Sequence, residues 1–84
     1  MTLTIYSRPG CHLCDDMKAV VNQVVRDVDE SASINEVDIS TDPALEALYG
    51  LEIPVLLIDG KKAAKYRVTE EALKKMMASG MADG

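Results

Sequence analysis

The sequence has no apolar run approaching the roughly 20 residues that a membrane-spanning helix requires. Its first residues show no basic segment followed by a long apolar stretch, so we expect neither a signal peptide nor a membrane as partner. Basic residues are also few, because nine Lys and Arg against fourteen Asp and Glu give a net charge of −5. Since phosphate binding depends on clustered Lys and Arg, this balance argues against nucleic acid as a partner.

Cysteine and histidine are scarce as well: the chain has two cysteines, Cys11 and Cys14, and one histidine, His12. Two cysteines cannot build a scaffold of several bridges, and thiols in the cytosol are mostly kept reduced. We therefore expect a cytoplasmic protein in which the cysteine pair serves chemistry or metal binding. A structural zinc site needs four ligands and a catalytic one at least three, so zinc would need a second chain. We expect no metal site within one chain.

What the sequence does contain is a regular succession of strand and helix signals, and its 84 residues suffice for one domain over residues 1–84. Apolar and β-branched segments predict four strands, at residues 3–6, 34–39, 55–58 and 61–66. Helical spacing and helix-start signals predict three helices, at residues 13–29, 43–49 and 70–79. In the second helix, Leu45, Leu48 and Tyr49 would form the apolar stripe, and Gly50 would follow in the left-handed conformation.

The order of these elements predicts an α/β fold, βαβαββα. Helices between the early strands favour parallel pairing of those strands. Asp59-Gly60 is a hairpin signal, which favours antiparallel pairing in the second half of the chain. We therefore expect a mixed four-stranded sheet with helices on both faces.

The most informative segment runs from Arg8 to Cys14, at the junction of the first strand and the first helix. The N–H groups in the first turn of a helix lack intrahelical partners, and here they would point toward the Cys11 sulfur. Together with the helix dipole and the charge of Arg8, they would stabilise a thiolate, which is the species that attacks disulfides. Cys14 would be more buried and placed to resolve a mixed disulfide formed at Cys11. This context favours redox chemistry over a structural role for the pair.

Three stretches of the sequence match one known family. They are Cys11-His12-Leu13-Cys14, Asp42-Pro43 with Tyr49-Gly50, and Glu52-Ile53-Pro54-Val55. From Leu3 to about Ala78 the chain resembles glutaredoxin-like proteins of the thioredoxin-fold superfamily, and it is especially similar to a small family with Cys-x-Leu-Cys at its active site. The resemblance implies a thioredoxin-like fold and a thiol-disulfide oxidoreductase whose partner is a disulfide-containing protein or a low-molecular-weight thiol. We expect a monomer.

The resemblance also implies roles for individual residues. Cys11 would be the nucleophile and Cys14 the resolving thiol, and the two would form the redox disulfide. The substrate-binding residues would be Arg8, His12, Ile53 and Pro54, with the backbone of Ile53 available to a bound thiol substrate. Pro54 would follow a cis peptide bond and face the two cysteines.

Where the sequence departs from that family, it weighs against glutathione as the co-substrate. Glutathione-binding glutaredoxins usually carry a Gly-Gly pair after the hairpin, which permits a close backbone approach. Here the segment is Ala63-Ala64-Lys65-Tyr66-Arg67. We expect no resident cofactor. Two other functions stay open: an iron–sulfur or metal carrier that uses Cys11 with an external thiol, and a non-catalytic interaction domain with the same fold.

Overall fold

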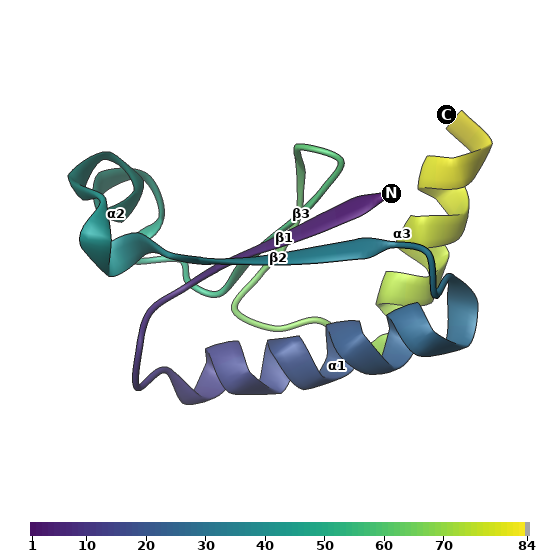
Figure 1. Ribbon diagram of the computed structural model, residues 1–84, viewed down its shortest axis with the longest axis horizontal. Helices are drawn as coiled ribbons and strands as arrows, with labels where there is room; N and C mark the ends of the chain where they lie inside the picture. Colours follow the sequence, from purple (N-terminus) through teal and green to yellow (C-terminus); the bar gives the residue numbers. More distant parts are fainter. Residues whose placement is uncertain (84) are drawn as a thin grey trace.

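The computed structural model describes the backbone of residues 1–83 and the side chains of residues 1–78 (Figure 1). Along the chain the elements are β1 (Thr2–Ser7), α1 (His12–Val28), β2 (Ser33–Asp38), a 3-10 turn η1 (Ile39–Thr41), α2 (Pro43–Tyr49), β3 (Val55–Ile58), β4 (Lys61–Lys65) and α3 (Glu70–Asp83). The predicted order of strands and helices is confirmed. None of the described helices is long and apolar enough to cross a bilayer.

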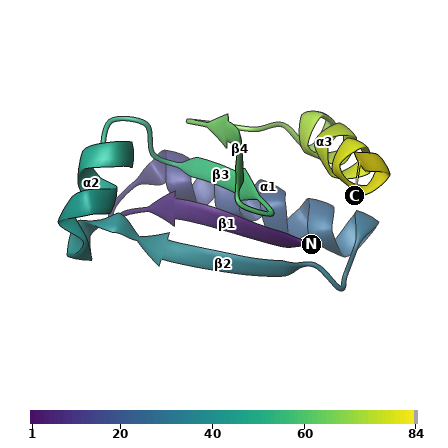
Figure 2. The same cartoon turned by 90° about the horizontal axis from the view of Figure 1, so that it is seen from above.

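The four strands form one mixed sheet in the order β2-β1-β3-β4. β1 pairs with β2 in parallel, and β3 pairs with both β1 and β4 in antiparallel fashion. Figure 2 shows the sheet with β1 between β2 and β3, and β4 at one edge. The predicted mixed four-stranded sheet is therefore confirmed, with the parallel pair in the first half of the chain and the hairpin in the second.

One face of the sheet is covered by α1 and α3. Leu3 and Ile5 of β1 are buried on this face, and they pack against α1 and α3 in a single apolar cluster. The remaining buried members of the cluster are Met17, Val21, Val24, Val25, Leu56, Leu73 and Met77. Valine is an indifferent helix former, so burial of the apolar face of α1 is what stabilises this helix.

The opposite face of the sheet carries α2, and an aromatic pair joins the two. Tyr6 alternates with the buried residues of β1, and its ring stacks on that of Tyr49 with centroids 4.6 Å apart. The interplanar angle is 13°. Helices therefore lie on both faces, as the sequence predicts, and the stacking fixes α2 above the carboxyl end of β1.

Two predictions about helix ends are wrong. Gly50 follows α2 with φ −53° and ψ −31°, in the right-handed rather than the left-handed region. α3 continues past Gly80 to Asp83, since a glycine inside a helix costs only about 1 kcal/mol relative to Ala. The apolar stripe of α2 is also narrower than predicted, because Leu48 is 67% exposed.

The end of the sheet where β1 begins is closed by a small set of hydrogen bonds. The Thr2 N–H donates to Asp59 Oδ1 at 2.8 Å, and the Asp59 N–H donates to the Thr2 carbonyl at 2.8 Å. The Ser33 N–H donates to the Met1 carbonyl at 3.0 Å. The amino terminus, the β3–β4 hairpin turn and the start of β2 therefore meet at this end.

Candidate active site

The cysteine segment lies at the other end of the sheet, where several connections meet. Tyr6, near the end of β1, pairs with Val37 near the end of β2 and with Val55 at the start of β3. Val55 in turn pairs with Lys65 at the end of β4. The loops that follow β1, β2 and β4, and the loop that precedes β3, therefore all emerge at this end.

Cys11 is the N-cap residue of α1. Its backbone is extended, with φ −94° and ψ 109°, and its Sγ accepts a hydrogen bond from the Cys14 N–H at 3.1 Å. Gly10 precedes it with φ +78°, a conformation that residues with a side chain rarely adopt, and this lets the chain turn into the helix. The sulfur thus takes the position that a Ser or Asp oxygen occupies in most helix caps, facing the positive end of the helix dipole.

The two cysteines are joined in a disulfide, with their Cα atoms 5.2 Å apart. Cys14 is buried, with 1% of its surface exposed, whereas Cys11 is only partly buried. His12, between them in sequence, is exposed to solvent. Cys11, at the helix terminus, is therefore the more accessible of the two cysteines.

Arg8 connects the cysteine loop to α2. Its guanidinium donates a hydrogen bond to Oε1 of Glu46, and the two side chains are each about two-fifths exposed, at 38% and 42%. Asp38 lies nearby, at the end of β2. Its pKa is lowered chiefly by the Ser40 hydroxyl, then by the Ser40 N–H, with a smaller contribution from the charge of Arg8. Arg8 is thus engaged by acidic groups of two neighbouring elements.

Gly50 leaves room beside Glu46, the acidic partner of Arg8. A Cβ at this position would lie 2.5 Å from the Glu46 carbonyl oxygen, 3.1 Å from Glu46 Oε1 and 3.4 Å from Arg8 Nη2. The first of these distances is shorter than any ordinary van der Waals contact. The close approach of Glu46, and not a left-handed backbone, therefore explains the glycine at position 50.

Gly50→Ala is expected to destabilise the protein by about 1–3 kcal/mol, the cost typical of overpacking. Without the clash the same change would stabilise the protein, because Ala suits a right-handed backbone better than Gly does. Urea unfolding of the variant and the parent measures the difference. A variant as stable as the parent, or more stable, would contradict the close approach.

The loop before β3 carries the predicted cis peptide bond, between Ile53 and Pro54. Pro54 is buried and Ile53 is partly buried. The carbonyl oxygen of Pro54 accepts the Tyr66 N–H at 2.8 Å, and the Tyr66 hydroxyl donates to the Leu51 carbonyl at 3.1 Å. One residue after β4 therefore holds the cis-proline loop at two points.

Tyr66 is a site residue that the sequence did not indicate. Its φ of +68° lies in the left-handed region, which is an outlier for a bulky side chain. Such strained residues persist only where surrounding contacts determine them, and they cluster at functional sites. Tyrosine favours strands, so the sequence pattern assigned Tyr66 to the end of β4.

Glu52 fixes the same loop from its other side. Its carboxylate pairs with Lys62 and, at 3.7 Å, with Lys65, both on β4. The pKa of Glu52 is held below its usual value mainly by the hydrogen bond from Lys62. The loop that carries Ile53 and Pro54 is therefore tied to β4 by backbone, aromatic and ionic contacts together.

In the part of the chain that the structure describes, no group of three or more His, Cys, Asp or Glu side chains could hold a metal ion. The cysteine pair at a helix terminus, the cis-proline loop at the same end of the sheet and the mixed sheet itself form the arrangement found in thioredoxin folds. A family model for the glutaredoxin-like domain (DUF836) matches residues 2–78. The chain belongs to the glutaredoxin-like domain family.

Solved structures agree with this assignment. The glutaredoxin-like domain is similar to a structural-genomics target protein from X. campestris, at 30% identity and a TM-score of 0.77, over 92% of this chain and 96% of that one. It is also similar to a mutant thioredoxin from Halobacterium salinarum, at 26% identity and a TM-score of 0.64, over 93% of this chain and 72% of the other. A protein from Nitrosomonas europaea matches at 25% identity and a TM-score of 0.70, over 89% and 88% of the two chains.

A search of curated proteins finds no match to this chain. Chloroplastic thioredoxin z, at 12% identity and a TM-score of 0.74 over 96% of this chain and 78% of the other, shares the fold. The family, the thioredoxin-fold relatives and the bonded cysteine pair together point to a redox role for the glutaredoxin-like domain.

Proposed function

We propose that this glutaredoxin-like domain is a thiol-disulfide oxidoreductase in which Cys11 is the nucleophile and Cys14 is the resolving thiol. The observation that carries the proposal is the hydrogen bond from the Cys14 N–H to Cys11 Sγ at the start of α1. A thiolate at a helix N-terminus is stabilised by unpaired N–H groups and by the helix dipole. The enzyme would act as a monomer in the cytoplasm.

In the proposed reaction, the Cys11 thiolate attacks one sulfur of a substrate disulfide. A mixed disulfide forms, the substrate disulfide breaks, and its other sulfur leaves as a thiolate that takes a proton from solvent. Cys14 then loses its proton and attacks Cys11 Sγ, which releases the second substrate thiol. The substrate gains two electrons and two protons, and the enzyme is left with the Cys11–Cys14 disulfide. Two external thiols, or one dithiol, reverse these steps on the enzyme: they are oxidised to a disulfide, and their two electrons and two protons restore the Cys11–Cys14 dithiol.

Three observations support a polypeptide disulfide as the substrate over glutathione. Leu51, directly before the Glu52-Ile53-Pro54 segment, is 94% exposed, and it offers an apolar contact beside the site. Tyr66 and Arg67 follow β4 with full side chains, so the close backbone approach of a Gly-Gly pair is missing. His12 is exposed next to Cys11 and would contact the substrate from the helix side. The backbone of Ile53 would pair with the substrate segment.

Arg8 has a different role in this proposal from the one its position in sequence suggests. Because its guanidinium is bound by Glu46, it would act by holding the Pro9-Gly10-Cys11 loop against α2. It would be a positioning residue for the nucleophile, and substrate binding would fall to the residues around the cis-proline loop.

The proposal predicts that the Cys11 thiol has a pKa below the ordinary cysteine value of about 8.5. Cys14→Ser keeps the backbone N–H that donates to Cys11 Sγ, so the rate of alkylation of this variant against pH reports the thiolate at Cys11. The same variant in denaturant is the matched control, since it lacks the helix terminus. A midpoint at or above that of the unfolded control would remove the chemical basis of the proposed function.

A further inference from the structure

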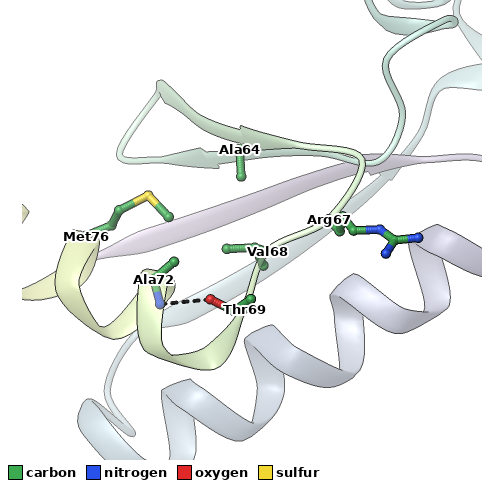
Figure 3. A pocket seen from close by; sticks show the side chains of 6 residues that line it. All are labelled: Ala64, Arg67, Val68, Thr69, Ala72 and Met76. Carbon is green, nitrogen blue, oxygen red and sulfur yellow. Dashed lines mark hydrogen bonds between the residues drawn. The ribbon is translucent and has the colours of Figure 1, made fainter.

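A groove outside the cysteine site lies between β4 and the first turns of α3 (Figure 3). Its volume is about 330 Å³, and its lining consists of Ala64, Arg67, Val68, Thr69, Ala72 and Met76. The groove exists because the strand and the helix face each other here with small side chains, Ala64 and Ala72. Its lining is apolar except at the end formed by Arg67 and Thr69, and its size lies within the range of ordinary ligand sites.

The strand beside this groove is the edge of the sheet. In the order β2-β1-β3-β4 the described residues place no strand on the outer side of β4. An edge strand presents unpaired N–H and C=O groups, to which an extended peptide can add. An apolar pocket next to such an edge accepts a side chain of the added strand, and this combination is a common mode of peptide recognition.

Two cations lie at opposite ends of β4, and one of them, Arg67, also lines the groove. Lys61 opens the strand and Arg67 follows it, and neither forms an ion pair with another described side chain. Lys61 pairs in register with Ile58, which packs against the core, so Lys61 extends from the face of the sheet that carries the groove. Lys62 and Lys65, by contrast, are bound by Glu52. Two cations without an ion-pair partner among the described side chains therefore lie along β4 and just after it, whereas the acidic Glu70 and Glu71 lie in the first turn of α3.

We propose that the groove binds an extended segment of a partner protein, which adds as a strand to the outer edge of β4. The segment places one apolar side chain between Ala64 and Ala72 and carries acidic residues opposite Lys61 and Arg67. β4 has five residues, about 16 Å of extended chain. Cations at the start of this strand and two residues beyond its end fit a peptide, whereas a small anion would meet only one of them.

The proposal needs neither cysteine and goes beyond the proposed redox function. One end of the groove adjoins Tyr66, whose N–H donates to the Pro54 carbonyl. A partner held along β4 would therefore lie next to the cis-proline loop, and its own chain would be brought to the redox site without a covalent bond.

The test uses the Cys11→Ser/Cys14→Ser double variant, so that no disulfide can form with the probe. A random library of displayed peptides about nine residues long, enough to pass both ends of β4, is selected on this protein. We expect enriched peptides to share an apolar residue flanked on both sides by Asp or Glu. Ala72→Leu, which fills the groove, should weaken the selected peptides about tenfold or more. Ala19→Leu adds the same side chain to an exposed position on α1 and should leave their binding unchanged.

Charge reversal gives a second measurement that does not alter the apolar lining. Arg67→Glu or Lys61→Glu should weaken the selected peptides about threefold to tenfold, with a smaller loss at high salt. Arg26→Glu, the same change on α1, should have no effect. Failure to enrich peptides, equal binding to Ala72→Leu and to its parent, or binding of free decanoate in place of peptides would each overturn the proposal. Because the protein lacks both thiols, none of these results bears on the redox function.

Discussion

Replacing Cys11 with Ser is expected to abolish disulfide turnover, with a loss of about a thousandfold or more. A serine hydroxyl is not ionised at neutral pH, and the helix terminus that stabilises a thiolate cannot make it a nucleophile of comparable strength. Cys14→Ser should behave differently. The attacking sulfur is kept, but nothing nearby can release the adduct, so a mixed disulfide should accumulate on Cys11.

Intact-protein mass spectrometry after incubation with a small disulfide measures both outcomes. Cys14→Ser should gain the mass of one half of the disulfide, and Cys11→Ser should gain little, because its remaining thiol is only 1% exposed. The double variant is the control for adducts elsewhere. Equal trapping by the two single variants would show that the assignment of nucleophile and resolving thiol is wrong, even if turnover itself is observed.

Leu73→Ala should cost about 2–5 kcal/mol of unfolding free energy, because it removes a fully buried side chain from the core. Leu73 lies in α3 and packs in the cluster formed by β1, α1 and β3. A domain of this size has a total stability of about 5 kcal/mol. The variant is therefore expected to be largely unfolded at physiological temperature.

Leu48→Ala is the matched control, since it makes the same chemical change on a helix at a side chain that is 67% exposed. It should change stability by less than about 0.5 kcal/mol. Urea unfolding followed by circular dichroism measures both variants. If the two variants lost similar amounts of unfolding free energy, the burial of Leu73 and the exposure of Leu48 would both be contradicted.

Most of the fold could be predicted from the sequence because its signals are local. The spacing of valines on one side of α1 gives a helix, and Val55-Leu56-Leu57-Ile58 is apolar throughout because β3 lies inside the sheet. Thr69, directly before α3, is a residue type that favours helix N-caps, and its Oγ1 accepts the Ala72 N–H at 3.1 Å. Each of these features depends on residues a few positions apart.

Two of the errors concern α2, which rests on a distant part of the chain through the Tyr6–Tyr49 stack, and the third is the continuation of α3 past Gly80. A glycine after a helix normally indicates a left-handed cap, but here Gly50 is right-handed, and a Cβ at this position would meet the Glu46 carbonyl oxygen at 2.5 Å and Glu46 Oε1 at 3.1 Å. Leu48 was placed in the apolar stripe, yet α2 has seven residues and rests on the sheet through Tyr49. So short a helix buries one narrow strip of surface.

The candidate site, too, could be predicted from the sequence only in part. The cysteine pair and its place at the start of α1 follow from neighbouring residues, and so they could be predicted. Tyr66 belongs to the site only because β4 brings it to the Pro54 carbonyl. Its left-handed backbone could not be predicted, because tyrosine by itself favours extended conformations. The groove beside β4 is likewise invisible in sequence, because it depends on two alanines that meet across a strand and a helix.

The closure of the far end of the sheet by Met1, Thr2, Asp59 and Ser33 has a practical consequence for how the protein can be handled. The amino terminus and the hairpin turn lie one strand length away from the cysteines (Figure 1). A surface anchor attached at the amino terminus would present the cysteine end to the solution, and a fluorophore on the Asp59-Gly60 turn would leave the redox centre clear. Immobilised in this orientation, the molecules would all offer the same face to a passing partner.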